Sequence, residues 1–214
     1  MPSTPSRRQF LLGTAVSGLA LGARTLRAEG RSARKFTMDL VCGNLGVSAK
    51  LPDAIALAHK HAFESIAPDI GYLSAISESQ LAELQEDLKS KKLVWGAAGL
   101  PVDFRGGQTS FQGGLTKLPA QAAALRRAGA SRMGTWISPG HATLTYRANF
   151  QQHATRLREI GKVLGDHGVR LGLEYVGPRT SWSATRFPFI HTMAEIRELI
   201  AAIDLPNVGF VLDS

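Results

Sequence analysis

Cysteine is nearly absent from this 214-residue chain, in which Cys42 is the only one. A single cysteine cannot form an internal disulfide, so the fold must be held together by its core. Cys42 lies in an apolar stretch, where the role of a small buried hydrophobic residue fits it best. Low-complexity tracts are also missing, and the apolar content is ordinary. These features predict one globular domain with a substantial core.

Long hydrophobic runs are scarce as well, and the apolar N-terminal run at residues 11–23 spans only about 13 residues. A bilayer core of ~30 Å needs about 20 apolar residues, so this run is too short to be a membrane anchor. It follows Arg7 and Arg8 and precedes a small residue, Ala28, which is the order of an export signal of the twin-arginine type. We therefore expect residues 1–28 to be removed. The mature protein is then periplasmic or otherwise exported and keeps no stable membrane span.

Acidic residues are outnumbered by basic ones, which gives a formal charge of +8. Residues 1–28 hold four arginines and no acid, and subtracting four from eight leaves +4 for the remainder. A charge of this size is typical of a solvated surface rather than of a nucleic-acid interface. We therefore expect no nucleic-acid partner.

A glycine-rich phosphate turn is missing after the first expected strand. The loop there reads CGNLG, which lacks the GxGxxG spacing of dinucleotide-binding sheets. Apolar runs and helical spacing alternate along the remaining chain. A strand that runs into this glycine loop is expected at residues 36–47, and further strands are expected at residues 63–66, 93–100, 132–138, 169–176 and 208–212. Helices are expected between them, at residues 51–62, 77–88, 118–128, 150–164 and 192–203.

Cap signals mark where three of these helices begin or end. Ser77 with Gln80, and Thr192 with Glu195, have the spacing of capping boxes at helix starts. Gly168 follows the fourth helix and is suited to a left-handed cap at its end. These signals separate the expected helices from the strands beside them.

Strict alternation of strands and helices predicts an α/β fold with a parallel sheet and right-handed crossovers. Glu174 and Asp213 lie at the carboxyl ends of the fifth and sixth strands, where a (β/α)₈ barrel places its chemistry. We therefore expect residues 35–214 to form an incomplete TIM barrel with about six of its eight βα units. Because such a barrel typically needs ~250 residues, we expect the chain to be truncated after the sixth strand. Open sheet edges then predict self-association, or a second polypeptide that supplies the missing half.

Three motifs in the second half of the chain suggest a family. They are LGLEYVGP at residues 171–178, FPFIHTM at 187–193 and NVGFVLDS at 207–214. Together they resemble the xylose isomerase-like TIM barrel superfamily, the sugar phosphate isomerase/epimerase group. The stretches MDLVCGNLGV and FESIAPDI fit the first βα unit of that group. The resemblance covers residues 35–214, which correspond to the first six strands of the family.

The resemblance implies a divalent metal held by a Glu, an Asp, a His and a second Glu from the ends of strands five to eight. Glu174 matches the first ligand and Asp213 the second, whereas the other two have no counterpart in this sequence. Such ligands suit Mn²⁺, Mg²⁺ or Co²⁺, and Zn²⁺ also fits. The resemblance further implies that the two metal-bound glutamates move a proton next to a carbonyl, through an enediolate that the metal stabilises. Glu174 is then catalytic and has half of that role. The partner is then a small carbohydrate.

Further side chains are expected near a carbohydrate bound at the carboxyl ends of the strands. Trp136 ends the fourth strand, His141 follows it, Trp182 follows the fifth, and Asp103 and Arg105 follow the third. Each has a structural alternative, since loop histidines are commonly solvated and aromatic side chains commonly fill a core. The remaining helical histidines are expected at the surface: His59, His61, His153 and His167.

Three functions of different classes follow. The first is a metal-dependent sugar, sugar-phosphate or polyol isomerase or epimerase that is exported after folding. The second is a nuclease of the apurinic endonuclease type, but such an enzyme needs a histidine-rich trinuclear zinc site, which the ends of strands two and three do not offer. The third is an inactive remnant, or one subunit of a split enzyme, which the two unmatched ligands support. We favour the first hypothesis.

Overall fold

Two parallel sheets follow one another along the chain in the computed structural model, which describes residues 35–212. The first consists of β1 (Asp39–Leu40), β2 (Ser65–Ile66) and β3 (Val94–Trp95), and the second of β4 (Ala98–Gly99), β5 (Arg132–Ile137), β7 (Arg170–Tyr175) and β9 (Val208–Phe210), in these orders. Every pair within them is parallel. The strand expected at residues 93–100 is divided into β3 and β4, which only residues 96–97 separate. The expected succession of parallel strands is confirmed, and with it the fold class of an incomplete TIM barrel. The expected signal at residues 1–28 and the side chain of Asp213 lie outside the described residues.

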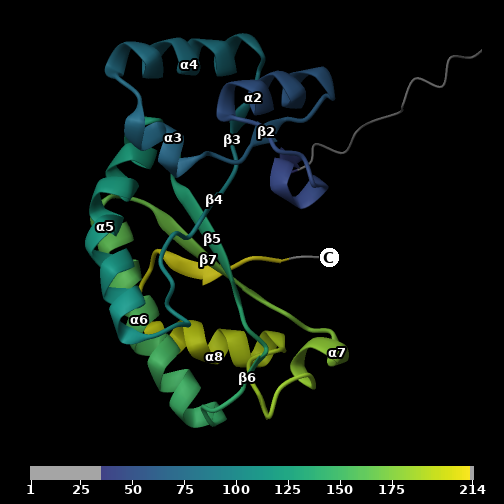
Figure 1. The fold of residues 1–214 in the computed structure, drawn as a ribbon, viewed down its shortest axis with the longest axis vertical. Coiled ribbons are helices and arrows are strands. Elements are labelled where there is room, and N and C mark those ends of the chain that lie inside the picture. The colour runs from purple at the N-terminus through teal and green to yellow at the C-terminus, as the bar shows by residue number, and fades with distance from the viewer. Residues whose placement is uncertain (1–34, 213–214) are drawn as a thin grey trace, which may run out of the picture. The chain divides into compact units, whose positions relative to one another are not determined.

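Helices connect these strands, as a parallel sheet requires. They are α2 (Leu51–Lys60), α3 (Ile70–Ala75), α4 (Glu78–Ser90), α5 (Gln108–Arg127), α6 (Tyr146–Asp166), α7 (Arg179–Trp182) and α8 (Met193–Ile203). Figure 1 shows α5, α6 and α8 along the sheet that contains β5 and β7, and α6 and α8 both pack on β7. The helices expected near α2, α4, α6 and α8 are confirmed, with small shifts at their ends. No helix within residues 35–212 is long and apolar enough to span a membrane.

The first strand is shorter than expected. The sequence predicts a strand that runs into a glycine loop over residues 36–47. The strand, β1, ends at Leu40, and the loop begins with a 3₁₀-helix, η1 (Cys42–Leu45). Gly46 ends this turn with φ 70°, a left-handed conformation that glycine adopts without strain. The expected glycine loop is therefore a tight turn.

Helix α5 begins earlier than expected. The sequence predicts a start at Leu118, whereas α5 begins at Gln108 and runs through Pro119. Proline inside a helix removes one backbone hydrogen bond, so the turns before it need another source of stability. Phe111 and Leu118 are both fully buried and lie two turns apart on one face of α5. Packing of this face stabilises the helix despite the proline.

The cap signals are confirmed where the sequence places them. Ser77 and Gln80 form a complete capping box at the start of α4, and Thr192 and Glu195 form another at the start of α8. Gly168 has φ 66° after the end of α6, as a left-handed cap residue should. Local hydrogen bonding therefore sets the ends of the helices that flank β7 and β9.

The core lies between the helices and one face of the sheet that contains β7. Leu171 and Leu173 are 1% and 0% exposed on that face. Gly172 and Glu174 alternate with them, and successive side chains in a strand point to opposite faces. Glu174 is therefore directed away from the helices, toward the interior of the incomplete barrel.

Helix α6 comes close to the chain segment before β9 at Gly161. A Cβ atom added there would lie 2.7 Å from Leu205 Cδ1 and 3.0 Å from Val208 Cγ2. Asn207 Nδ2 also donates a hydrogen bond to the Gly161 carbonyl oxygen at 2.8 Å. This contact fixes β9, the strand next to β7, against the helix layer.

We predict that Gly161→Ala lowers the free energy of unfolding by about 1–3 kcal/mol, because the added methyl group overpacks this contact. Gly113→Ala is the matched control, since Gly113 is an exposed glycine in α5 with no atom within 4 Å of an added Cβ. Alanine there should raise the free energy of unfolding by about 0.5–1 kcal/mol. Urea denaturation at neutral pH measures both, and equal stabilities of the two variants would contradict the close approach.

Candidate active site at the carboxyl ends of the strands

Glu174 lies near the carboxyl end of β7, between β5 and β9. Its side chain is half-buried, and the strand register aligns it with Trp136 of β5. On the other side, Leu173 pairs with Phe210 of β9, and Asp213 follows beyond the described part of that strand. The structure thus brings Glu174 to the expected edge of the sheet, and its partnership with Asp213 stays a prediction.

Arg105 contacts two aromatic rings at the end of β5. Its guanidinium carbon is 4.3 Å from the centroid of the Phe104 ring and 4.4 Å from that of Trp136. Arg105 Nη2 donates hydrogen bonds to Thr135 Oγ1, at 2.9 Å, and to the Trp136 carbonyl oxygen. Burial lowers the pKa of Arg105, and the nearby Asp103 carboxylate raises it only in part. The loop after β4 therefore delivers a cation to the strand that neighbours Glu174.

His141 follows β5 and has a defined proton position. Backbone N–H groups of Thr143 and Leu144 donate to its Nδ1 at 3.1 and 2.8 Å. A neutral His141 therefore carries its proton on Nε2, which can donate to a substrate oxygen. His141 belongs to β6 (Gly140–His141), which pairs antiparallel with β8 (Phe187–Pro188). This pairing, which the sequence does not reveal, joins the loops that follow β5 and β7.

Asp103 hydrogen-bonds within its own loop. Its Oδ1 accepts from the backbone N–H groups of Arg105 and Gly106 at 3.2 and 2.9 Å, and its Oδ2 accepts from Ser110 Oγ at 3.2 Å. Gly106 packs so closely against this carboxylate that a Cβ atom would clash with Oδ2. These contacts hold the backbone that carries Arg105. Direct contact between Asp103 and a carbohydrate stays a prediction.

The two tryptophans expected at the site differ in their surroundings. Trp182 ends α7 and stacks on His191, with ring centroids 4.7 Å apart and an interplanar angle of 28°. His191 in turn donates its backbone N–H to Glu195 Oε2 at 3.0 Å, which ties the loop after β7 to the start of α8. Trp136 is 49% exposed, so part of its ring surface is open to solvent at the end of β5.

His153 is buried, and its expected place at the surface is wrong. It lies on α6, is 2% exposed and meets the Phe104 ring edge-on, with centroids 5.3 Å apart. The spacing could have shown this, because Phe150 and Leu157 lie three residues before it and four after it, on the same helix face. His59 and His61 are exposed as expected, and His167 is partly exposed.

The protonation of His153 reflects its burial and the cations around it. Burial lowers the pKa of His153 to about 4, although a hydrogen bond to the Asn149 carbonyl oxygen, at 2.9 Å, raises it. The charges of Arg105, Arg156 and His141 lower this pKa further. His153 is therefore neutral near pH 7, and the space around it is rich in positive charge.

Arg156 holds the loop that carries Arg105 from the core side. It lies on α6, and its Nη1 donates to the carbonyl oxygens of Phe104 and Gly106 at 2.9 and 2.7 Å. Its Nη2 donates to Gln108 Oε1 at 3.0 Å. Arg156 is only 8% exposed, and a buried arginine is rare enough that the helical pattern gives no reason to expect it.

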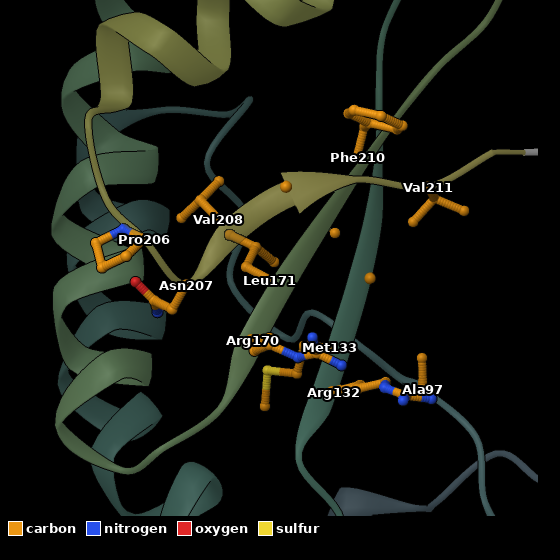
Figure 2. A pocket seen from close by; sticks show the side chains of 13 residues that line it. Ala97, Arg132, Met133, Arg170, Leu171, Pro206, Asn207, Val208, Phe210 and Val211 are labelled. Carbon is orange, nitrogen blue, oxygen red and sulfur yellow. The ribbon is translucent and has the colours of Figure 1, made fainter.

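A hollow of about 360 Å³ lies on the same face of the sheet, toward the amino ends of the strands. Figure 2 shows β5, β7 and β9 along it, with Arg132 and Arg170 at the starts of their strands and Val211 after β9. Three glycines also line it: Gly134, Gly172 and Gly209. No acid is among the described residues that line the hollow, and Glu174 is not one of them. The candidate catalytic acid therefore lies at the carboxyl ends of the strands and not in this hollow.

The fit of a divalent metal is supported in part. Glu174 contributes a carboxylate, which is a ligand that hard divalent cations prefer. Within residues 35–212, no group of three or more His, Cys, Asp or Glu side chains is arranged to hold a metal ion. Asp213, the other expected ligand, is outside that range.

Comparison with known proteins agrees with this architecture. The family model for xylose isomerase-like TIM barrels matches residues 55–214. The structure of a xylose isomerase domain protein from Alicyclobacillus acidocaldarius is similar, with 28% identity and a TM-score of 0.65, over 77% of this chain and 58% of that one. The chain thus spans less than two thirds of that relative. The search of curated proteins gave no match.

Two further solved structures share the fold. The IolI protein, whose structure contains a zinc atom, has 19% identity and a TM-score of 0.64 over 84% of this chain and 63% of its own. A D-psicose 3-epimerase with D-tagatose, from Clostridium cellulolyticum H10, has 17% identity and a TM-score of 0.59 over 75% of this chain and 57% of its own. One of these neighbours contains a metal, and the other is a sugar epimerase.

We predict that acid destabilises the folded chain through His153. Its folded-state pKa of about 4 lies below the ordinary value of 6.5, so the unfolded chain takes up a proton first as the pH falls. The free energy of unfolding should drop between about pH 6.5 and about pH 4, by up to roughly 3 kcal/mol, and this contribution should vanish above that range. Urea denaturation across the range measures the drop. It should be smaller in His153→Gln and unchanged in His59→Gln; an unaltered drop in His153→Gln would contradict the assignment.

Proposed function

Because the chain belongs to the xylose isomerase-like TIM barrel family, we propose that it acts in a sugar isomerase or epimerase with Glu174 as the proton-transferring residue. One observation carries the proposal: Glu174 is half-buried at the carboxyl end of a central strand, on the face away from the helices. The epimerase among the structural neighbours supports the same class of reaction. The substrate is then a small polyhydroxy compound with a carbonyl group.

The reaction needs a base beside a carbon atom and polar groups that orient the adjacent oxygen. Glu174 takes the proton from the carbon next to the carbonyl, which gives an enediolate. Return of the proton to the neighbouring carbon gives the isomer, whereas the epimer requires a second acid that protonates the same carbon from the opposite face. His141 Nε2 donates a hydrogen bond to a substrate oxygen, since Nδ1 already accepts two backbone N–H groups. The open ring surface of Trp136 packs on the apolar face of the sugar.

A divalent metal would complete this site from the side of Glu174. When bound, such an ion supplies an electrophile for the substrate oxygen. Glu174 is the described residue that would hold it, together with Asp213 as the resemblance implies. The neighbour that contains a zinc atom supports metal binding by this scaffold.

We predict that Glu174→Gln lowers the rate of hydrogen exchange between a ketohexose and solvent by about 10²- to 10⁴-fold, because the amide keeps the size of the side chain but accepts no proton. The assay follows the hydrogen next to the carbonyl of D-fructose, D-tagatose and D-psicose by NMR in deuterium oxide with Mn²⁺. Glu83→Gln, at an exposed position of α4, should keep the wild-type rate.

Two outcomes would count against this proposal. Wild-type exchange in a correctly folded Glu174→Gln variant would remove Glu174 from the mechanism. If the wild-type protein catalysed no exchange on any of the three sugars, the protein would not be a ketohexose isomerase or epimerase. Circular dichroism confirms in either case that the variants are folded.

A further inference from the structure

We propose that Arg105 binds an anionic substituent, a carboxylate or a phosphate, of the carbohydrate substrate. The inference rests on the proposed function, because it names the chemical class of substrate at the same site. Three features of the described residues carry it: the way Arg105 is held, the charge around it, and its place beside the strand of Glu174.

Arg105 is fixed in place before any ligand binds. Its guanidinium carbon lies within 4.4 Å of the ring centroids of both Phe104 and Trp136, so the planar group contacts two aromatic rings. Thr135 Oγ1 and the Trp136 carbonyl oxygen both accept from Nη2. A stacked guanidinium loses little conformational freedom on binding, which favours it as a preorganised recognition group.

Arg105 has no carboxylate of its own to neutralise it. Within the described residues it makes no salt bridge, and its buried Nε has no hydrogen-bond partner. Asp103 is the nearby acid, but its two oxygens accept from two backbone N–H groups and from Ser110 Oγ. A half-buried cation without a direct counterion is costly, and an anionic ligand group removes that cost.

The charge beyond Arg105 has the same sign. Arg156, nearly buried behind the loop, donates its hydrogen bonds to neutral oxygens of Phe104, Gly106 and Gln108. Burial is the main cause of the low pKa of His153, and the charges of Arg105 and Arg156 lower this pKa further. An anion at this position is therefore attracted by more than one group.

The position of Arg105 suits a substrate that also reaches Glu174. Its hydrogen-bond acceptors belong to Thr135 and Trp136, which pair in register with Leu173 and Glu174 of the next strand. Adjacent strands lie about 4.8 Å apart, so Arg105 is held at the same end of the sheet as Glu174, on the neighbouring strand. Nη2 already donates two hydrogen bonds and Nε is buried, so Nη1 is the nitrogen left to a ligand. Its charged N–H groups bind carboxylate and phosphate oxygens more strongly than a neutral hydroxyl group.

The test is isothermal titration calorimetry on the full chain at constant ionic strength. The probes are D-fructose 6-phosphate, D-glucuronate, neutral D-fructose and inorganic phosphate. We expect at least one sugar anion to bind about tenfold or more tightly than D-fructose and than inorganic phosphate. Arg105→Gln should abolish this preference, and Arg105→Lys, which keeps the charge but loses the planar guanidinium that contacts the two rings, should reduce it by about 3- to 10-fold.

Arg170→Gln is the matched control, because Arg170 begins β7 at the opposite end of the strand and lines the hollow. It should keep the wild-type preference. The readout is the ratio of the affinities for charged and neutral sugars, which a merely structural role of Arg105 would not change. Arg105→Lys supplies this ratio if Arg105→Gln does not fold.

Four results would overturn the inference: equal affinities for D-fructose and both sugar anions, an unchanged ratio in a folded Arg105 variant, a ratio lost in Arg170→Gln instead, or inorganic phosphate bound as tightly as the sugar anions. The last result would indicate a site for a free ion. Failure of the proposed function is distinguishable, because the hydrogen-exchange assay with Glu174→Gln does not depend on anion binding. If the protein catalysed exchange on neutral sugars but bound charged and neutral sugars equally well, only the proposed role of Arg105 would be wrong.

Discussion

The pairing of β5 with β7 is the constraint on which the site depends. It runs in register from Arg132 with Arg170 to Ile137 with Tyr175, and it aligns Trp136 with Glu174. A slip of one residue would turn Glu174 toward the helices, because side chains alternate across a strand. Burial of Leu171 and Leu173 against the helix layer opposes that slip. The position of the acid is therefore set by the apolar residues beside it in sequence.

A continuous stack extends from this core to the end of β5. His153 meets Phe104 edge-on, Phe104 lies against Arg105, and Arg105 lies against Trp136. Only the last ring is substantially exposed. Burial is the main reason that the pKa of His153 is low, and the charges of Arg105 and Arg156 lower it further. The same two arginines are the cations that favour an anion at this part of the site.

Local rules explain which parts of the structure could be predicted. The capping boxes at Ser77 and Thr192 and the alternation in β7 depend on neighbours in sequence, and so they were visible there. Non-local packing explains two wrong predictions. Burial of Phe111 stabilises the part of α5 that precedes Pro119, so the helix begins earlier than expected. His153 lies on the buried apolar face of α6 although its side chain is polar. The β6–β8 pairing and the stacking of Arg105 join distant segments, so no local pattern could reveal them. Glu174 could be predicted because the motif LGLEYVGP, at residues 171–178, carries the resemblance to the family.

The candidate catalytic residue lies in a strand, whereas the candidate substrate-binding residues lie in or beside loops. Glu174 is part of a strand whose geometry the family shares, whereas Arg105, His141 and Trp182 lie in or beside loops, which vary freely on such scaffolds. The anion binding that we propose at Arg105 would hold the substrate equally before and during the proposed proton transfer, so it would change which molecule is accepted without lowering the barrier at Glu174. Membership of the family thus supports the proposed class of reaction, and the positive charge in the loop after β4 supports the proposed class of substrate.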